Sequence, residues 1–296
     1  MTTTSKAVLA AVAAFSCWGL FPIYWKLFPE LPGDRLFMHR LSWSLLTLAI
    51  IIPLAGKLEG LKAIYREPRK RWWLVLSAAL ISVNWLLYMI AVTSGMILEA
   101  SMGYFLNPLF NLVIGGVFLR ERLRKTQWPA VAFAVLGVVW IGAKSGLEAF
   151  PWMALALSLT WGTYGVIRKQ TAVGSLEGLS FETAVVYLPF LVWFLGLGGS
   201  FAADVQALGW KFPLLMLSGA VTCLPLVLFA YAAKRMPLQQ LGFIQYLSPS
   251  LKFVCGWLIF NEPLSAARWQ GFVLIWVGLA WYTLEALRSR ERSRAS

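Results

Sequence analysis

Residues Leu106–Trp140, LNPLFNLVIGGVFLRERLRKTQWPAVAFAVLGVVW, recur in altered form as Leu247–Trp281, LSPSLKFVCGWLIFNEPLSAARWQGFVLIWVGLAW, 141 positions further along the chain. The two stretches align without a gap and share nine residues, which include a proline, a glutamate and two tryptophans. A weaker match at an offset of 143 pairs Trp18 with Trp161 near the start of each half. Because both stretches lie in apolar segments, the repeat predicts a polytopic membrane protein with two related halves. Such repeats are typical of transporters whose site lies between the halves.

The composition of the 296-residue chain is that of a membrane protein. It is 59% hydrophobic and 13% charged, whereas a soluble domain is about 45 to 50% apolar and about 25% charged. A helix needs about 20 apolar residues to cross the hydrocarbon core of a bilayer, while a barrel strand needs about 10. We predict ten transmembrane helices, at Ala7–Trp25, Leu36–Leu54, Trp72–Thr93, Glu99–Leu119, Trp128–Ala143, Leu147–Ile167, Leu179–Leu197, Phe212–Ala233, Leu241–Phe260 and Trp269–Leu287.

Basic residues predict the orientation of the chain. The formal net charge is +13, and with a cytoplasmic N-terminus 19 of the 26 Lys and Arg residues fall in inner segments and 5 in outer segments. The positive-inside rule explains this charge without a nucleic-acid partner and places both termini in the cytoplasm. Each half, 1–145 and 146–296, holds five spans, and this odd number inverts the second half. The predicted fold class is an all-α polytopic membrane protein of two inverted five-helix repeats, the second with a short basic tail, in the bacterial inner (cytoplasmic) membrane.

Several kinds of chemistry have no support in the sequence. The short basic loops contain no GxxxxGK motif followed by Ser or Thr, so the chain does not hydrolyse ATP itself. Cys17, Cys223 and Cys255 are scattered through apolar segments, which indicates packing residues rather than disulfides or metal ligands. We therefore predict no metal, no cofactor and no catalytic residue.

Short motifs along the whole chain carry a family resemblance. They are Asn84-Trp85-Leu86-Leu87-Tyr88, Gly103-Tyr104-Phe105-Leu106-Asn107-Pro108, Gln245-Tyr246-Leu247-Ser248-Pro249, His39-Arg40 with Trp43-Ser44, Tyr164-Gly165-Val166-Ile167-Arg168-Lys169 and Glu182-Thr183. Together they resemble the RarD-type permeases of the EamA group in the drug/metabolite transporter superfamily. The resemblance implies ten helices in inverted five-helix repeats and transport of small organic molecules. It also leads us to expect an acidic residue shortly before the His-Arg pair, where residues 34–38 read DRLFM, so no role is carried over to an acid there.

Two polar stripes occupy equivalent places in the fourth and ninth spans. Their members are Tyr104, Asn107 and Asn111 in the fourth span and, related to them by the repeat, Gln245, Ser248 and Lys252 in the ninth. The spacing i, i+3, i+7 puts each stripe on one helix face. Pro108 and Pro249 interrupt backbone hydrogen bonds beside the stripes, which membrane helices tolerate where partners or a cavity satisfy the freed groups. We predict that the stripes face each other across a substrate cavity and that the prolines mark helix breaks.

Two basic residues lie inside predicted spans. Lys252 is near the middle of its span, where an ammonium group costs at least about 2.5 to 3.5 kcal/mol. We expect it to bind a carboxylate or a polar oxygen of the substrate, in preference to a purely structural pairing with a carbonyl or a neighbouring helix. Arg40 lies about one turn inside the end of its span, and substrate binding and a side chain extended to the interface explain it equally well.

His39 and Glu182 are candidates for proton coupling. His39 is the single histidine and can titrate near neutral pH, although an isolated histidine is more often a packing residue. The repeat pairs Glu182 with His39, while Glu182 and Glu99 both lie near helix starts, where the backbone dipole stabilises a carboxylate without any transport role. Glu121 and Glu262 recur just past span ends on opposite sides of the membrane, and we predict that they cap or lock the two gates symmetrically.

Further side chains complete the predicted pocket. Asn84 and Tyr88, spaced i, i+4 on the third span, add a polar stripe, although hydrogen bonding between helices explains Asn84 equally well. Aromatic walls are expected from Trp18, Trp85, Trp161, Tyr164 and Tyr246.

A cavity that mixes amide, hydroxyl, cationic and aromatic groups suits a small amphipathic solute such as an amino acid, an aromatic metabolite or an antibiotic. The expected function is secondary active or facilitative transport by alternating access, with the small-molecule substrate and the lipid bilayer as partners; a homodimer stays open. The rival interpretation is an intramembrane enzyme acting on a lipid or lipid-linked substrate, which the single histidine and the lack of paired carboxylates argue against. A channel would need polar rings along a wide pore, and the sequence has none.

Overall fold

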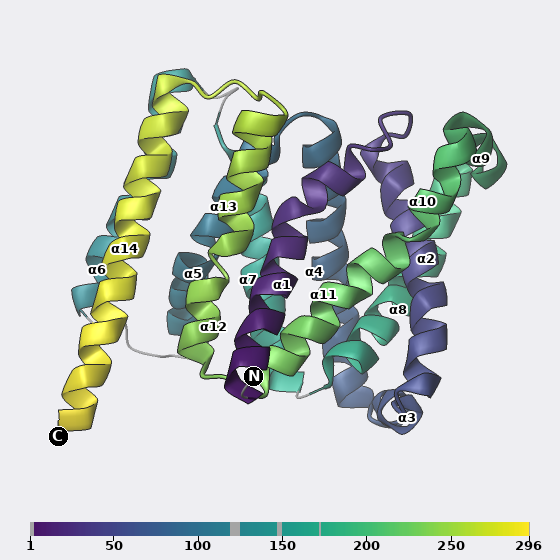
Figure 1. Cartoon of the computed structure of the whole chain (residues 1–296), viewed down its shortest axis with the longest axis horizontal. Coiled ribbons are helices and arrows are strands. Elements are labelled where there is room, and N and C mark those ends of the chain that lie inside the picture. Colours follow the sequence, from purple (N-terminus) through teal and green to yellow (C-terminus); the bar gives the residue numbers. More distant parts are fainter. Residues whose placement is uncertain (1–2, 119–124, 147–149, 172, 296) are drawn as a thin grey trace.

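The computed structural model describes residues 3–118, 125–146, 150–171 and 173–295, and this part of the chain folds into helices without any strand (Figure 1). The helices are α1 (Thr3–Trp25), α2 (Gly33–Leu54), α3 (Leu58–Arg66), α4 (Pro68–Thr93), α5 (Ile97–Phe118), α6 (Trp128–Ser145), α7 (Trp152–Thr171), α8 (Ser175–Gly196), α9 (Phe201–Leu208), α10 (Phe212–Met216), α11 (Ser218–Ala233), α12 (Leu238–Ile244), α13 (Leu247–Val254) and α14 (Ala266–Ala295). Among the described residues, six helical segments are long and apolar enough to cross a membrane: Ser5–Trp25, Gly33–Leu54, Pro68–Thr93, Lys125–Lys144, Ser175–Gly196 and Phe201–Ala233.

Eight of the ten predicted spans coincide with one continuous helix each. Helix α7 begins at Trp152 rather than at the predicted Leu147, which lies outside the described residues, as does Leu119 at the predicted end of the fourth span. The eighth predicted span, Phe212–Ala233, is divided at Leu217 into α10 and α11. The sequence-based prediction has no counterpart of α3 and α9, because these short helices are not continuous apolar runs.

The ninth predicted span, Leu241–Phe260, departs furthest from a straight helix. It consists of α12, a break at residues 245–246, and α13, which ends in a wider turn. The cause of the break is Pro249, which has no N–H to donate to the carbonyl of Gln245. That carbonyl instead accepts a hydrogen bond from the Ser248 N–H at 3.2 Å. Of the polar stripe on this span, Gln245 therefore lies in the break, and Ser248 and Lys252 lie on α13.

Two other features distinguish the proline-containing helices. The wider turn after α13 is a π-helical turn at Cys255–Ile259, in which the Phe260 N–H donates to the Cys255 carbonyl at 2.9 Å. Such turns are rare and occur often at functional sites. Pro108, in contrast, lies inside α5, which continues through it without a break.

The helices stand side by side, with α6 and α14 at one edge and α9 and α10 at the other (Figure 1). Helices α3 and α9 lie at opposite ends of the bundle, and we call these the α3 end and the α9 end. Helix α1 begins and α14 finishes toward the α3 end. At the α6–α14 edge, a Cβ on Gly137 would lie 2.8 Å from the Gly271 carbonyl oxygen, and one on Gly278 would lie 2.8 Å from the Ala130 carbonyl oxygen. Small residues allow this close approach of two backbones.

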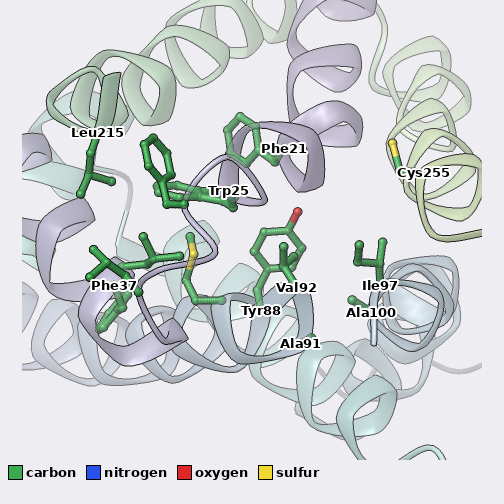
Figure 2. Packing of buried hydrophobic residues seen from close by; sticks show 14 of the residues in the cluster. Phe21, Trp25, Phe37, Tyr88, Ala91, Val92, Ile97, Ala100, Leu215 and Cys255 are labelled. Carbon is green, nitrogen blue, oxygen red and sulfur yellow. The ribbon is translucent and has the colours of Figure 1, made fainter. Parts of the chain in front are cut away.

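Large apolar side chains pack against one another at the α9 end (Figure 2). This cluster draws residues from α1, α2, α4, α5, α7, α9 and α10, and it includes the fully buried Trp25 and Phe28. Phe21 and Tyr88 form its inner edge, one turn of helix before Trp25 and Val92. Close contacts of this kind accumulate dispersion energy. The α9 end of the bundle is therefore densely packed.

Candidate functional site

A cavity of about 100 Å³ lies among the helices, next to the packed cluster with which it shares Phe21 and Tyr88. Its wall consists of Phe15, Trp18 and Phe21 from α1, Arg40 from α2, Trp85 and Tyr88 from α4, Tyr104 and Asn107 from α5, Trp161 from α7, Gln245 from the break, and Ser248, Pro249 and Lys252 from α13. Helices from both halves of the chain therefore surround one space.

Most residues that the sequence predicted for the pocket line this cavity. Eight of the twelve do so, namely Arg40, Tyr88, Tyr104, Asn107, Trp161, Gln245, Ser248 and Lys252. The predicted aromatic walls Trp18 and Trp85 are also present. The prediction missed Phe15 and Phe21, because an aromatic residue in an apolar run carries no signal that separates a cavity wall from a lipid-facing surface.

Four predicted pocket residues lie elsewhere. Asn111 is exposed, since α5 turns this end of the stripe away from the cavity. Asn84 donates hydrogen bonds to the Leu157 carbonyl and the Thr160 hydroxyl, both at 2.9 Å, and so links α4 to α7. Tyr246 packs against a second apolar cluster beside α14. The fourth, Tyr164, belongs to an ionic group described below.

Lys252 occupies a protected position on the cavity wall. Its side chain is buried, and its ammonium donates a hydrogen bond to the Ser248 hydroxyl at 2.7 Å, one turn earlier on α13. The ammonium also lies 4.4 Å from the ring centroid of Tyr104 and 5.6 Å from that of Tyr88. An aromatic face attracts a cation electrostatically, but it replaces only part of the hydration that burial removes.

Arg40 is a second buried cation on the same wall. Its side chain does not extend to the surface; its Nε–H donates to the Thr222 hydroxyl at 3.2 Å, and its Cζ lies 4.1 Å from the ring centroid of Trp85. This placement favours the cavity interpretation of Arg40 over a side chain that reaches the membrane interface. Two cations from opposite halves of the chain thus face one space.

Two polar groups on the cavity wall have no partner. Among the described residues, the Tyr88 hydroxyl and the Asn107 Oδ1 are buried and make no hydrogen bond. Buried polar atoms are almost always paired, and an unpaired one calls for an explanation such as an unseen ligand or water. In Figure 2 the Tyr88 hydroxyl points toward the side on which Phe21 and Cys255 lie. Hydrogen-bonding capacity is therefore left over where a solute would fit.

Comparison with known proteins assigns this architecture to a family. The sequence matches the EamA-like transporter family twice, over residues 5–143 and 151–284. The chain belongs to the EamA-like transporter family. Protein RarD of Streptomyces exfoliatus is 39% identical over 289 residues, which cover 97% of this chain and 91% of that protein. An uncharacterized transporter of Pseudomonas aeruginosa is 38% identical over 296 residues, which cover 97% of this chain and 96% of that protein.

A solved crystal structure shares the fold, with a TM-score of 0.60 at 20% identity over 96% of this chain and 98% of the other. Together with the relatives named RarD, the family match makes this chain a RarD-type member of the EamA group in the drug/metabolite transporter superfamily. It is a membrane transporter, and the cavity described above is the candidate site of transport.

In this EamA-family transporter, His39 lies outside the cavity, at the α9 end. Its Nε2 is 3.1 Å from the carboxylate of Asp204 on α9, and Arg35 donates to the same carboxylate at 2.9 Å. Asp204 is fully buried and accepts from both. Asp204 carries no signal in the sequence, because α9 lies outside the predicted apolar runs. The three residues join the start of α2 to α9.

Glu182 lies toward the other end of the transporter. It accepts a hydrogen bond from the Ser77 hydroxyl at 2.6 Å and from the Tyr164 hydroxyl at 3.4 Å, and Nε of Arg168 is 3.7 Å away. Although the repeat pairs Glu182 with His39, each therefore has its own ionic partner and the two do not contact each other. A direct relay between them has no support in this arrangement.

Two further carboxylates at the α9 end hold helix starts in place. Glu262 accepts hydrogen bonds from the backbone N–H groups of Ile97 and Leu98, at 2.7 and 2.8 Å, and so caps α5 from the loop before α14. Glu99 accepts one from the Met153 N–H at 2.9 Å near the start of α7. Glu262 therefore caps a helix start, which is one of the two roles expected from the sequence. Its repeat equivalent Glu121 lies outside the described residues.

Proposed function

We propose that this transporter carries a small amphipathic organic solute, amino-acid-like or aromatic, through the central cavity by alternating access. The observation that carries the proposal is that both halves contribute polar and cationic groups to one aromatic-walled cavity, with Tyr104 from the first half and Lys252 from the second. A site shared by two halves can be presented to either side when the halves move relative to each other.

The proposed topology is ten transmembrane helices in two inverted five-helix repeats, with both termini in the cytoplasm of a bacterial inner membrane. Three features support it. The chain begins and finishes toward the same end of the bundle, and the short helices α3 and α9, which follow the second helix of each half, lie at opposite ends (Figure 1). The excess of basic residues on the predicted inner segments also favours this orientation. The α3 end is then cytoplasmic.

The packed α9 end determines from which side of the membrane the solute reaches the cavity in this conformation. Because the cluster around Trp25 and the cap at Glu262 close the outer end, the solute enters and leaves the cavity from the cytoplasmic side in this state. Opening of the outer end would require α5 to separate from the loop that carries Glu262. Within the cavity, Lys252 is proposed to hold a polar group of the solute while the tryptophans contact its apolar part.

Counterflow in proteoliposomes tests the proposal. A thermal-shift screen of amino acids, aromatic acids and antibiotics first selects solutes that stabilise the purified protein, and each is then measured as a labelled compound. We expect saturable counterflow of a chemically unchanged solute, its loss in Lys252→Met, and its retention in Lys144→Met. Lys144 is a matched control, since its ammonium also lies over an aromatic ring, that of Trp140 at 5.0 Å, but outside the cavity.

The same measurement separates the rivals. A solute that emerges chemically altered would indicate an enzyme, and flux that does not saturate would indicate a channel. Wild-type counterflow in Lys252→Met, at normal expression, would remove Lys252 from the site.

A further inference from the structure

The two cations of the cavity have no negative partner in the described part of the chain. Thirteen residues line the cavity, and none of them is Asp or Glu. No ion pair among the described residues involves Arg40 or Lys252. Both side chains are nevertheless buried, at 4% and 3% exposure. Buried charges are normally paired, because the protein interior does not replace the hydration they lose.

Both cations are grouped around the same pair of tyrosines. The Lys252 ammonium lies over the ring of Tyr104 and near that of Tyr88, whose centroids are 6.0 Å apart. The Arg40 guanidinium also interacts electrostatically with Tyr104 and Tyr88. The positive charge is therefore concentrated in one region of the cavity.

Donor groups remain available in that region. Arg40 uses only its Nε–H, toward Thr222, so the rest of its donor fork is free within the described residues. Lys252 uses one of its three N–H bonds, toward Ser248. The Tyr88 hydroxyl has no acceptor. This surplus of donors calls for a ligand rich in acceptors, and a carboxylate offers about four acceptor sites and no donor.

The remainder of the cavity wall is apolar and largely aromatic. Phe15, Trp18, Phe21, Trp85 and Trp161 supply this surface. Indole and phenyl faces stack well on a flat ring. An amino acid fits the wall less well than an acid without an amine, because its ammonium would meet two cations and no carboxylate.

We propose that the solute is an organic dianion, with two carboxylates or an equivalent doubly charged acid group on a ring-sized apolar body. One negative group binds the free fork of Arg40 and the other binds Lys252, while the ring stacks on the tryptophans. This proposal rests on the proposed transport function of the cavity and names the class of its substrate. Two negative charges neutralise the two cations, so the loaded cavity is close to neutral.

A charge series on one ring tests the proposal. Binding of phthalate, benzoate, benzamide, phenylalanine and benzylamine to the purified full-length protein in detergent is measured by isothermal titration calorimetry near neutral pH. We expect phthalate to bind about tenfold more tightly than benzoate, and benzoate more tightly than benzamide, since each step adds or removes one charge-assisted contact. Phenylalanine and benzylamine are expected to be the weakest.

Variants locate the effect in the cavity. Arg40→Gln and Lys252→Met should each remove the advantage of phthalate over benzoate. Arg40→Lys keeps the charge and should retain most of this advantage, and it replaces Arg40→Gln in the test if that variant fails to fold. Arg235→Gln and Lys144→Met are the controls, because these side chains also cover aromatic rings, of Tyr231 and Trp140, outside the cavity. Equal losses in the controls would assign the effect to surface charge and overturn the proposal.

The same experiments distinguish failure of the dianion proposal from failure of the transport proposal. If benzamide or phenylalanine binds as tightly as phthalate and shows Lys252-dependent counterflow, the dianion proposal is wrong and the transport proposal stands. If phthalate binds with the expected cavity dependence but is released chemically altered, the charge preference is correct and transport is wrong. A flat series with no cavity dependence overturns the dianion proposal directly.

Discussion

Replacement of Glu262 with alanine removes the carboxylate that accepts the backbone N–H groups of Ile97 and Leu98. A hydrogen bond to a charged group contributes about 1.5 to 3 kcal/mol, and loss of an ordinary helix cap costs about 1 kcal/mol. Glu262 is 8% exposed, so water can satisfy part of what is lost. We therefore expect Glu262→Ala to destabilise the packed α9 end by about 2 to 3 kcal/mol, which is more than the loss of an ordinary cap and less than the loss of two hydrogen bonds to a charged group.

A native thiol reports this loss. Cys255 is fully buried beside the cap, in the π-helical turn that leads to Glu262, and its Sγ is 3.9 Å from the Gly19 carbonyl. With the other two cysteines replaced by serine, Cys255 reacts with a maleimide only when the α9 end opens. A cost of about 2 to 3 kcal/mol corresponds to about 30- to 150-fold more opening, and we expect the labelling rate to rise by a similar factor.

Two variants calibrate the measurement. Glu262→Gln keeps one acceptor and loses the charge, so its labelling rate should lie between those of the wild type and Glu262→Ala. Glu67→Ala is the matched control, since Glu67 also precedes a helix, α4, but its exposed side chain makes no capping hydrogen bond. Labelling of Glu262→Ala at the wild-type rate, or an equal acceleration in Glu67→Ala, would contradict a capping role for Glu262.

Two further substitutions test the packing of the bundle. Asp204→Asn removes the buried carboxylate charge that Arg35 and His39 share. Loss of a hydrogen bond to a charged group costs about 1.5 to 3 kcal/mol, so we expect a lower melting temperature, and an unchanged one would contradict this. Gly219→Ala would put a Cβ 2.1 Å from a backbone carbonyl of α2, so we expect loss of monodisperse protein in size-exclusion chromatography. Gly165→Ala, which has open space around it, should elute as the wild type does.

Much of the fold and part of the site can be read from residue types and their order. The apolar runs place eight helices, since a span of hydrocarbon imposes a length that few other structures need. The spacing of Tyr104 and Asn107, and of Ser248 and Lys252, identifies residues that do line one cavity. Motif resemblance finds the family, which the comparisons confirm.

Other features depend on how the helices meet. Asn111 continues the stripe of Tyr104 in the sequence and yet is exposed, because a helix face is defined by its neighbours as well as by its period. Tyr246 packs against the apolar cluster beside α14 although its neighbour Gln245 lines the cavity, because the surrounding helices decide which side of this turn meets the cavity. Local spacing carries no information about either effect.

The pairing of charged groups is the clearest case of a long-range effect. His39 meets Asp204 across 165 positions, and Glu262 meets Leu98 across 164. The offset of 143 positions pairs His39 with Glu182 in the sequence, yet His39 meets Asp204 and Glu182 meets Ser77, so the two do not contact each other. Which charges find a partner, and which two stay unpaired in the cavity, follows from packing in three dimensions, because the energy of a charge depends on what surrounds it and not on its place in the chain.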